Sequence, residues 1–131
     1  MNRSLTRYET WQGKELQLEW RGFIEDGGPP VDATGATAVF LLKNYCEDED
    51  DAAVLRHSTE DGGVVLTDPL NGTVMVTITG EESEGLVAQT CGKPYRDYYG
   101  QFAVMIGTHQ EKSATFIIRY YLGAVKTAFA A

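Results

Sequence analysis

The chain has 131 residues, the usual size of one domain, and its 43% hydrophobic and 23% charged residues are typical of a globular protein. Nineteen acidic against eleven basic residues give a net charge of −8, which excludes nucleic-acid backbone as a good partner because phosphate binding needs clustered Lys and Arg. Residues 1–46 carry a net charge of −1, residues 47–84 carry −10 and residues 85–131 carry +3. The acidic excess therefore lies in the middle of the chain.

The N-terminal segment MNRSLTRYETWQGKE has no apolar run typical of a signal peptide, and no stretch of the chain approaches a membrane span. We therefore expect the protein in a cytoplasm, or in an assembly formed there. Cys46 and Cys91 are the only cysteines, too few for a disulfide scaffold and without the spacing of a metal or redox motif. We expect two small buried side chains, and whether the two are bridged stays open.

The first thirteen residues are polar apart from a few apolar side chains, and we expect them to form an arm. Residues 16–20 alternate apolar and polar side chains, the period of a half-buried strand. Residues 37–44 are rich in β-formers and apolar on both faces, which is typical of a more central strand. In the first strand, Leu16, Leu18 and Trp20 point to one side. The second strand carries Ala38, Phe40 and Leu42 on one face and Val39 and Leu41 on the other.

Two short apolar runs, residues 54–57 and 64–67, predict short strands. The clearest turn signal is the segment Asp68–Gly72, because its Asn-Gly pair tolerates the positive φ angles of tight turns. This turn leads into a strand at residues 73–79 whose inward side chains are Val74, Val76 and Ile78.

Thr79 and Glu82 have the spacing of a capping box and predict a brief helical turn. Two long strands follow at residues 98–107 and 115–122, joined by a polar stretch, and the run 124–129 can pair with a sheet edge.

These elements predict an all-β fold, an immunoglobulin-like antiparallel β-sandwich of about seven to eight strands with one short helical turn. We expect an N-terminal arm at residues 1–13 and a single sandwich domain at residues 14–131.

Catalysis needs a nucleophile with a base, a carboxylate pair or a metal-ligand set, and the sequence shows no motif of these kinds. His57 and His109 lie far apart and outside recognisable motifs, so we expect ordinary surface or half-buried histidines. The acidic run Glu47–Asp51 lacks the alternating ligands and central glycine of a calcium loop, which favours a solvated loop. We expect no enzymatic activity, no catalytic or metal residues and no cofactor.

The last two long strands are apolar on both faces. One face carries the predicted core, and the other still carries Tyr99, Ala103, Met105, Ile117 and Tyr121. Monomeric proteins seldom leave such contiguous apolar surface in water, so we expect another protomer, another protein or the chain's own arm to cover it. The candidate interface residues are Tyr8 and Trp11 of the arm with Tyr99, Ala103, Met105, Ile117 and Tyr121.

Aromatic side chains beside carboxylates also bind sugars, and the chain has two tryptophans near its start and a group of tyrosines near its end. A carbohydrate-binding β-sandwich is therefore the alternative hypothesis, and a small β-sandwich hydrolase is the third.

Several turns and strands occur in an order that resembles a known family. An amphipathic first strand precedes Asp32–Ala36 and Val39–Leu42; Gly62–Leu66 and Asp68–Val74 follow; a strand comes after Tyr98 and Tyr99; Gly123–Val125 closes the series. Over roughly residues 13–129, the chain resembles the small immunoglobulin-like domains of tailed-phage structural proteins, including the amino-terminal domain of baseplate upper proteins.

The resemblance implies a non-enzymatic virion protein, assembled in the host cytoplasm, that docks on other phage virion proteins of the tail or baseplate and associates with copies of itself. The chain ends where the sandwich ends, which favours an adaptor, connector or capsid-decorating role over direct host recognition. We expect neither nucleic acid nor membrane as a partner, and we expect the acidic segments Glu47–Asp51 and Glu81–Glu84 to face solvent.

Overall fold

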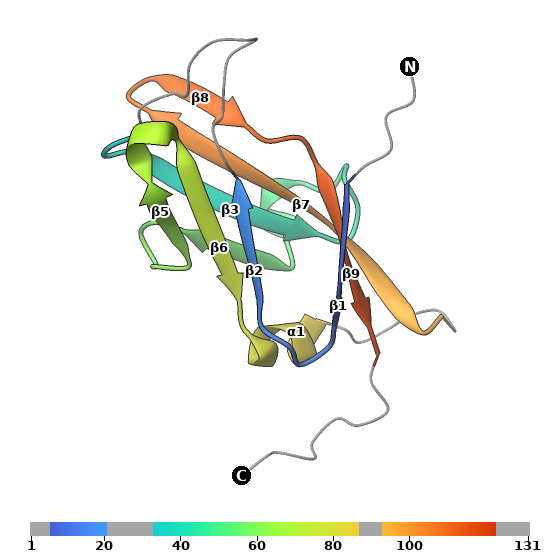
Figure 1. Cartoon of the computed structure of the whole chain (residues 1–131). Helices are drawn as coiled ribbons and strands as arrows, with labels where there is room; N and C mark the ends of the chain where they lie inside the picture. Colours follow the sequence, from blue (N-terminus) through green and yellow to red (C-terminus); the bar gives the residue numbers. More distant parts are fainter. Residues whose placement is uncertain (1–5, 21–32, 87–92, 123–131) are drawn as a thin grey trace.

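Alternating apolar side chains give each strand an inward face, and these faces meet between two sheets (Figure 1). The structure is a computed structural model that describes residues 6–20, 33–86 and 93–122. The larger sheet has the strand order β1-β9-β7-β3-β4, with β8 also paired to β7, and the smaller sheet has the order β2-β6-β5. The strands are β1 (Arg7–Trp11), β2 (Leu16–Trp20), β3 (Thr37–Lys43), β4 (Leu55–Ser58), β5 (Val64–Asp68), β6 (Thr73–Ile78), β7 (Tyr95–Ile106), β8 (His109–Lys112) and β9 (Phe116–Tyr121).

The chain crosses repeatedly between the sheets in the manner of an immunoglobulin sandwich. β2, β5 and β6 form one sheet, whereas the remaining strands belong to the other, so the crossings follow β1, β2, β4 and β6. The pairing of β1 with β9 is parallel, and the remaining strand pairs are antiparallel. The predicted all-β, immunoglobulin-like sandwich is confirmed, with nine strands in the described parts of the chain rather than seven or eight.

The prediction of an N-terminal arm is wrong for residues 7–11, because these residues form β1 at the edge of the larger sheet. The connection from β1 to β2 is fastened to the rest of the fold by the main-chain N–H of Gly13, which donates to Ser83 Oγ at 2.8 Å. Four of the five residues of β1 are exposed, so this edge strand carries little of the apolar alternation by which a strand is recognised in a sequence.

The sequence predicted only a polar connection between the last two long strands, but residues 109–112 of this connection form a further strand. They form β8, which returns along β7 after Gly107 adopts a left-handed φ of 61°. After β8, Ser113 makes two hydrogen bonds with the main chain of Phe102 in β7. Its main-chain N–H donates to the Phe102 carbonyl, and its Oγ accepts from the Phe102 N–H, each at 3.0 Å. One edge of β7 is therefore paired with β9 along its first half and with β8 along its second half.

Aromatic rings fill the centre of the core and join the two sheets. The Phe102 ring centroid lies 5.3 Å from that of Phe40, 6.0 Å from that of Phe116 and 6.1 Å from that of Trp20. Trp20 belongs to the smaller sheet, so this cluster spans the interior. The residues of β2 and β6 that the sequence predicted to point inward and that are buried are Leu18, Val74, Val76 and Ile78. On β3, β7 and β9, which are apolar on both faces, the buried residues are Ala38, Phe40, Leu42, Tyr98, Phe102, Val104, Phe116, Ile118 and Tyr120.

Thr79 and Glu82 form the predicted capping box at the start of α1 (Gly80–Leu86). The Glu82 N–H donates to Thr79 Oγ1 at 3.1 Å, and the Thr79 N–H donates to Glu82 Oε1 at 3.0 Å. In Figure 1 this helix lies at one end of the sandwich, next to the ends of β2 and β6.

The predicted Asn-Gly turn between β5 and β6 is also confirmed. A short 3₁₀ helix, η2 (Pro69–Asn71), ends at Gly72, whose left-handed φ is 64°. A second 3₁₀ helix, η1 (Asp50–Ala52), lies in the acidic loop between β3 and β4. The run predicted at residues 124–129 lies outside the described residues.

Tyr98 and Tyr120 provide a matched pair of buried hydroxyl groups. Their ring centroids are 6.1 Å apart, and burial raises the pKa of both phenols. The Tyr98 hydroxyl donates to the main-chain carbonyl of Leu86 at the end of α1, whereas no described residue gives the Tyr120 hydroxyl a hydrogen-bond partner.

Tyr98→Phe should lower the free energy of unfolding by about 1 kcal/mol, because it removes a buried hydrogen bond and leaves its acceptor unpaired. Tyr120→Phe should change this free energy by less than about 0.5 kcal/mol or raise it, since a buried hydroxyl without a partner is unfavourable. Urea unfolding of both variants measures the difference, and equal losses in the two would contradict it.

Candidate functional site

The outer face of the larger sheet, meaning the side that points away from the core, brings together residues from four strands. Strand register places Tyr99 beside Ile117, Trp11 beside Tyr121, and Ala103 beside Val39 of β3. These side chains share one face because residues two apart along a strand point the same way. The predicted set Trp11, Tyr99, Ala103, Met105, Ile117 and Tyr121 therefore lies on the outer face.

Tyr8 does not join this set. It pairs with Ile118, an inward residue of β9, and its ring lies 5.5 Å from that of the core residue Phe116. Tyr8 and Trp11 are an odd number of residues apart in one strand, so they must point to opposite faces. Tyr8 thus covers the open edge of the core rather than contributing to the outer face.

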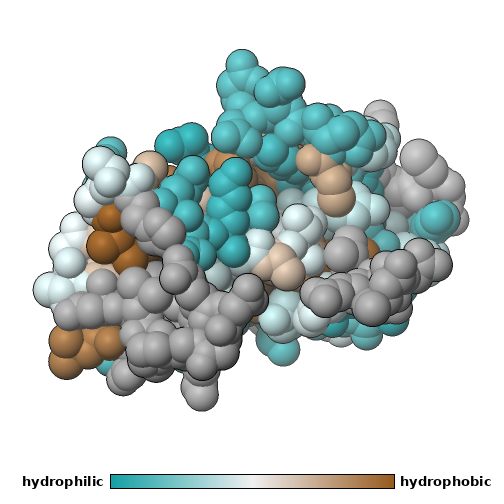
Figure 2. Space-filling view, turned by 90° about the horizontal axis from the view of Figure 1, so that it is seen from above, coloured by the Kyte–Doolittle hydropathy of each residue, from teal (hydrophilic) through white to brown (hydrophobic). Residues whose placement is uncertain are grey.

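The predicted apolar surface is less open than the sequence suggested. Met105 and Trp11 are exposed, at 42% and 55%, whereas Tyr99, Ala103, Ile117 and Tyr121 are half-buried. The end of the sandwich seen in Figure 2 is mostly hydrophilic or neutral, with hydrophobic residues in separate small patches. On the outer face itself, Gln101 lies between Tyr99 and Ala103 along β7, and Arg119 lies between Ile117 and Tyr121 along β9, so this face is a mixed surface.

An aromatic cluster occupies the part of the outer face formed by β1, β9 and the start of β7. The ring of Tyr121 lies 5.4 Å from that of Trp11 and 5.9 Å from that of Tyr95, between centroids. The Arg119 guanidinium lies 3.8 Å from the Tyr95 ring centroid and binds Asp97 through two hydrogen bonds of 2.7 and 3.0 Å. The sequence predicted that this strand begins at residue 98, whereas β7 begins at Tyr95, so the position of Tyr95 beside Tyr121 was not predicted.

A groove of about 230 Å³ is hollowed into the outer face beside this cluster. It is lined by Val39, Leu41, Lys43, Cys46, Asp50, Arg56, Tyr99, Gly100, Gln101, Ala103, Gln110, Lys112 and Thr115. Three cations, Lys43, Arg56 and Lys112, against the single carboxylate of Asp50 give the lining a net charge of +2. The lining of the groove is therefore positively charged, although the whole chain has a net charge of −8.

The acidic loop Glu47–Asp51 is fastened to the rim of this groove by Lys43. Lys43 Nζ donates to Asp50 Oδ1 at 2.9 Å and to the Asp48 carbonyl at 2.8 Å. The hydrogen bond and charge of Lys43 lower the pKa of Asp50. Four of the five acidic side chains of the loop are exposed, which confirms the predicted solvated loop.

Cys46 is exposed at the rim of the groove and not buried as predicted, because the polar loop carries it to the surface. Partial loss of hydration, followed by the charge of Glu47, raises the pKa of its thiol and disfavours the thiolate. Cys91 and any bridge to it lie outside the described residues, as does the side chain of His109.

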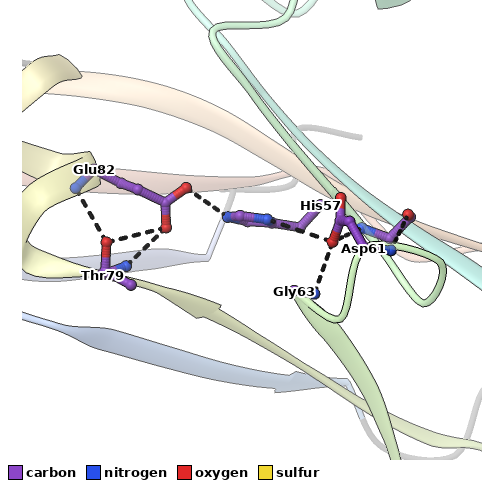
Figure 3. Close-up of polar contacts among 6 residues, drawn as sticks. His57, Asp61, Gly63, Thr79 and Glu82 are labelled. Atoms are coloured by element: carbon purple, nitrogen blue, oxygen red, sulfur yellow. Dashed lines mark hydrogen bonds and ion pairs between the residues drawn. The ribbon is translucent and has the colours of Figure 1, made fainter.

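His57 lies between two carboxylates at another edge of the sandwich (Figure 3). Its Nε2 is 2.8 Å from Glu82 Oε2, without the geometry of a hydrogen bond, and its Nδ1 is 3.9 Å from Asp61 Oδ1. A Cβ on Gly63 would lie 2.3 Å from His57 Nδ1, so only a glycine leaves room for the ring. The cluster fastens β4 to α1 and to the turn before β5, and the histidine is half-buried as predicted.

The described part of the chain contains no group of three or more His, Cys, Asp or Glu side chains placed to hold a metal ion. None of its helices is long and apolar enough to cross a membrane.

Asp61 closes the turn between β4 and β5. Its Oδ1 accepts hydrogen bonds from the main-chain N–H groups of Gly63 at 2.7 Å and Ser58 at 3.1 Å. These bonds stabilise the ionised carboxylate and lower the pKa of Asp61 from its ordinary value of 3.8.

Because this pKa is lowered by folding, the stability that Asp61 contributes is present above the unfolded pKa of 3.8 and is lost as the pH falls through the folded pKa. Asp61→Asn should therefore lower the melting temperature at neutral pH and flatten its decline below about pH 4. Thermal unfolding at a series of pH values measures this, with Glu60→Gln as the control for loss of an acidic charge in the same turn. Parallel curves for Asp61→Asn and the wild type would contradict the assignment.

Comparison with known proteins finds similarity at the level of structure. No family model and no curated protein matches this sequence. Among solved structures, the fold is similar to the N-terminal domain of phage TP901-1 ORF48, with 14% sequence identity, coverage of 91% of this chain and 84% of that chain, and a TM-score of 0.40.

Proposed function

We propose that the protein is a non-enzymatic virion structural protein of a tailed phage, an assembly or adaptor module that docks on other virion proteins and on copies of itself. The docking surface is the outer face of the larger sheet. The observation that carries this proposal is the set of apolar side chains on the outward side of β7 and β9, namely Tyr99, Met105, Ile117 and Tyr121. The virion assignment is supported by the resemblance of the sequence to phage structural domains.

The two sheets differ in the residues that they present outward. The smaller sheet presents the polar residues Gln17, Glu19 and Thr77 outward, with Val65 and Met75 as its apolar outward residues. A sheet that faces only water is expected to have a largely polar surface. The outer face of the larger sheet departs from this expectation, which favours it as the surface that a partner covers.

Burial of apolar area contributes about 25 cal/mol per Å². A modest contact made by the outer face would therefore be weak in a single pair of molecules. Repetition of the same contact around a tail or baseplate ring raises its effective strength, since each further contact forms at high local concentration. A small domain without enzymatic activity suits this role.

Met105→Glu should weaken self-association by about tenfold or more, because it places a charge at the centre of an apolar contact. Val65→Glu is the matched control, since Val65 is exposed to 48%, close to the 42% of Met105, and lies on the smaller sheet. Sedimentation equilibrium measures the association constant of each. A wild type that is monomeric throughout, or equal effects of the two substitutions, would contradict the proposed surface.

A carbohydrate-binding module is the second candidate, and the aromatic cluster of Trp11, Tyr95 and Tyr121 is the observation in its favour. Trp11 is 55% exposed, and the Tyr121 hydroxyl donates to Glu9 at 3.1 Å, so an aromatic surface lies beside a carboxylate.

This second function requires saturable binding of a glycan that Trp11→Ala abolishes. Tyr45→Ala is the control, because Tyr45 is 57% exposed and outside the cluster. A glycan array followed by titration calorimetry provides the measurement, and the absence of saturable binding would remove this candidate.

A further inference from the structure

Two sets of unpaired charges lie on the outer face of the larger sheet. Arg56 and Lys112 line the groove, and no carboxylate of the described residues lies within ion-pair distance of either. Glu47, Glu49 and Asp51 of the neighbouring loop are exposed and likewise make no ion pair within the described parts of the chain. The face thus carries a cationic recess and, next to it, an acidic projection.

The Lys43–Asp50 ion pair explains why these two sets do not neutralise each other within one molecule. Its 2.9 Å contact holds the middle of the loop on the rim of the groove. The carboxylates of Glu47, Glu49 and Asp51 stay in solvent, while Arg56 and Lys112 influence Asp50 only through longer-range attraction. The cations and carboxylates are therefore both available to another molecule.

A surface with a recess of one sign beside a projection of the other is complementary to itself. When two copies associate about a two-fold axis, any contact between loop and groove is made twice, because each residue pair occurs in both directions. The groove floor of Val39, Leu41 and Ala103 is apolar, so filling it also removes apolar surface from water.

The overall charge restricts how two copies can meet. Molecules of net charge −8 repel one another in most orientations, and the acidic segment of residues 47–84 strengthens this repulsion. The groove, with its net charge of +2, is a place on the outer face where an approaching acidic loop is attracted. Charge complementarity of this kind selects one orientation and suppresses others.

We propose that the groove of the outer face receives the acidic loop Glu47–Asp51 of a second copy of this chain, with Arg56 and Lys112 pairing with Glu47, Glu49 and Asp51 of that copy. This inference rests on the self-association proposed above and specifies its geometry. The apolar side chains of the outer face do not by themselves determine this contact between the loop and the groove.

The test is a charge exchange in the full chain, measured by sedimentation equilibrium. Arg56→Glu with Lys112→Glu makes the groove acidic, and Glu47→Lys with Glu49→Lys reverses the charge of two of the three loop side chains proposed to pair with the groove. Each double variant alone should associate at least about tenfold more weakly than the wild type, because like charges then meet twice in the dimer. Glu15→Lys with Glu60→Lys changes the net charge as the loop variant does, away from the groove, and should not weaken association.

Mixing the two double variants gives the decisive measurement. In the mixed dimer, the acidic loop of one variant meets the unchanged groove of the other, and the two lysines of the charge-reversed loop meet the acidic groove. The mixture should therefore recover an association within about threefold of the wild type, which a partly unfolded variant could not produce. Circular dichroism of each variant confirms that it is folded.

The two levels of the proposal fail in different ways. A wild type that stays monomeric overturns self-association itself and this contact with it. If the wild type dimerises and Met105→Glu weakens the dimer, the outer face remains the interface. In that case, double variants that associate normally, or that do not recover association on mixing, overturn the loop-in-groove contact.

Discussion

The packing of Phe102 between Phe40, Phe116 and Trp20 is the contact on which the rest of the structure depends. It joins the two sheets, and it fixes the inward side of β7, the longest strand. Gly100 makes this packing possible, because a Cβ there would lie 2.6 Å from Cε2 of Phe116. Since side chains alternate along a strand, the same contact also determines which residues of β7 form the outer face.

The crossover from β1 to β2 extends that face by one strand. Gly80 allows it, because a Cβ at this position would lie 2.2 Å from the Gly13 carbonyl oxygen. The buried Ser83 then accepts the Gly13 N–H and donates to the Gly80 carbonyl, which holds the crossover against α1. With β1 fixed in this way, Trp11 comes to lie against Tyr121, and the predicted arm becomes part of the sheet.

Charge and apolar area act together on the outer face. Apolar side chains supply the area whose burial favours association, and the signs of the charges around the groove favour one orientation of the partner. The Lys43–Asp50 pair links the two, because it holds the acidic loop at the rim without neutralising the remaining charges. In the assembly that we propose, electrostatics would provide specificity, and repetition of the contact would provide persistence.

Local periodicity and spacing in the sequence were enough to predict the all-β class, the inward faces of β2, β6, β7 and β9, and the capping box of α1. They could not show which of the two apolar faces of β3 points inward. The sequence did not predict β1 or β8, since short polar edge strands are defined by the strand beside them. It also misplaced Tyr8 and Cys46, whose surroundings come from distant segments. Only the tertiary structure brought Lys43, Arg56 and Lys112 from three different strands into one groove, because a charge pattern on a folded surface depends on strand register and not on neighbours in the chain.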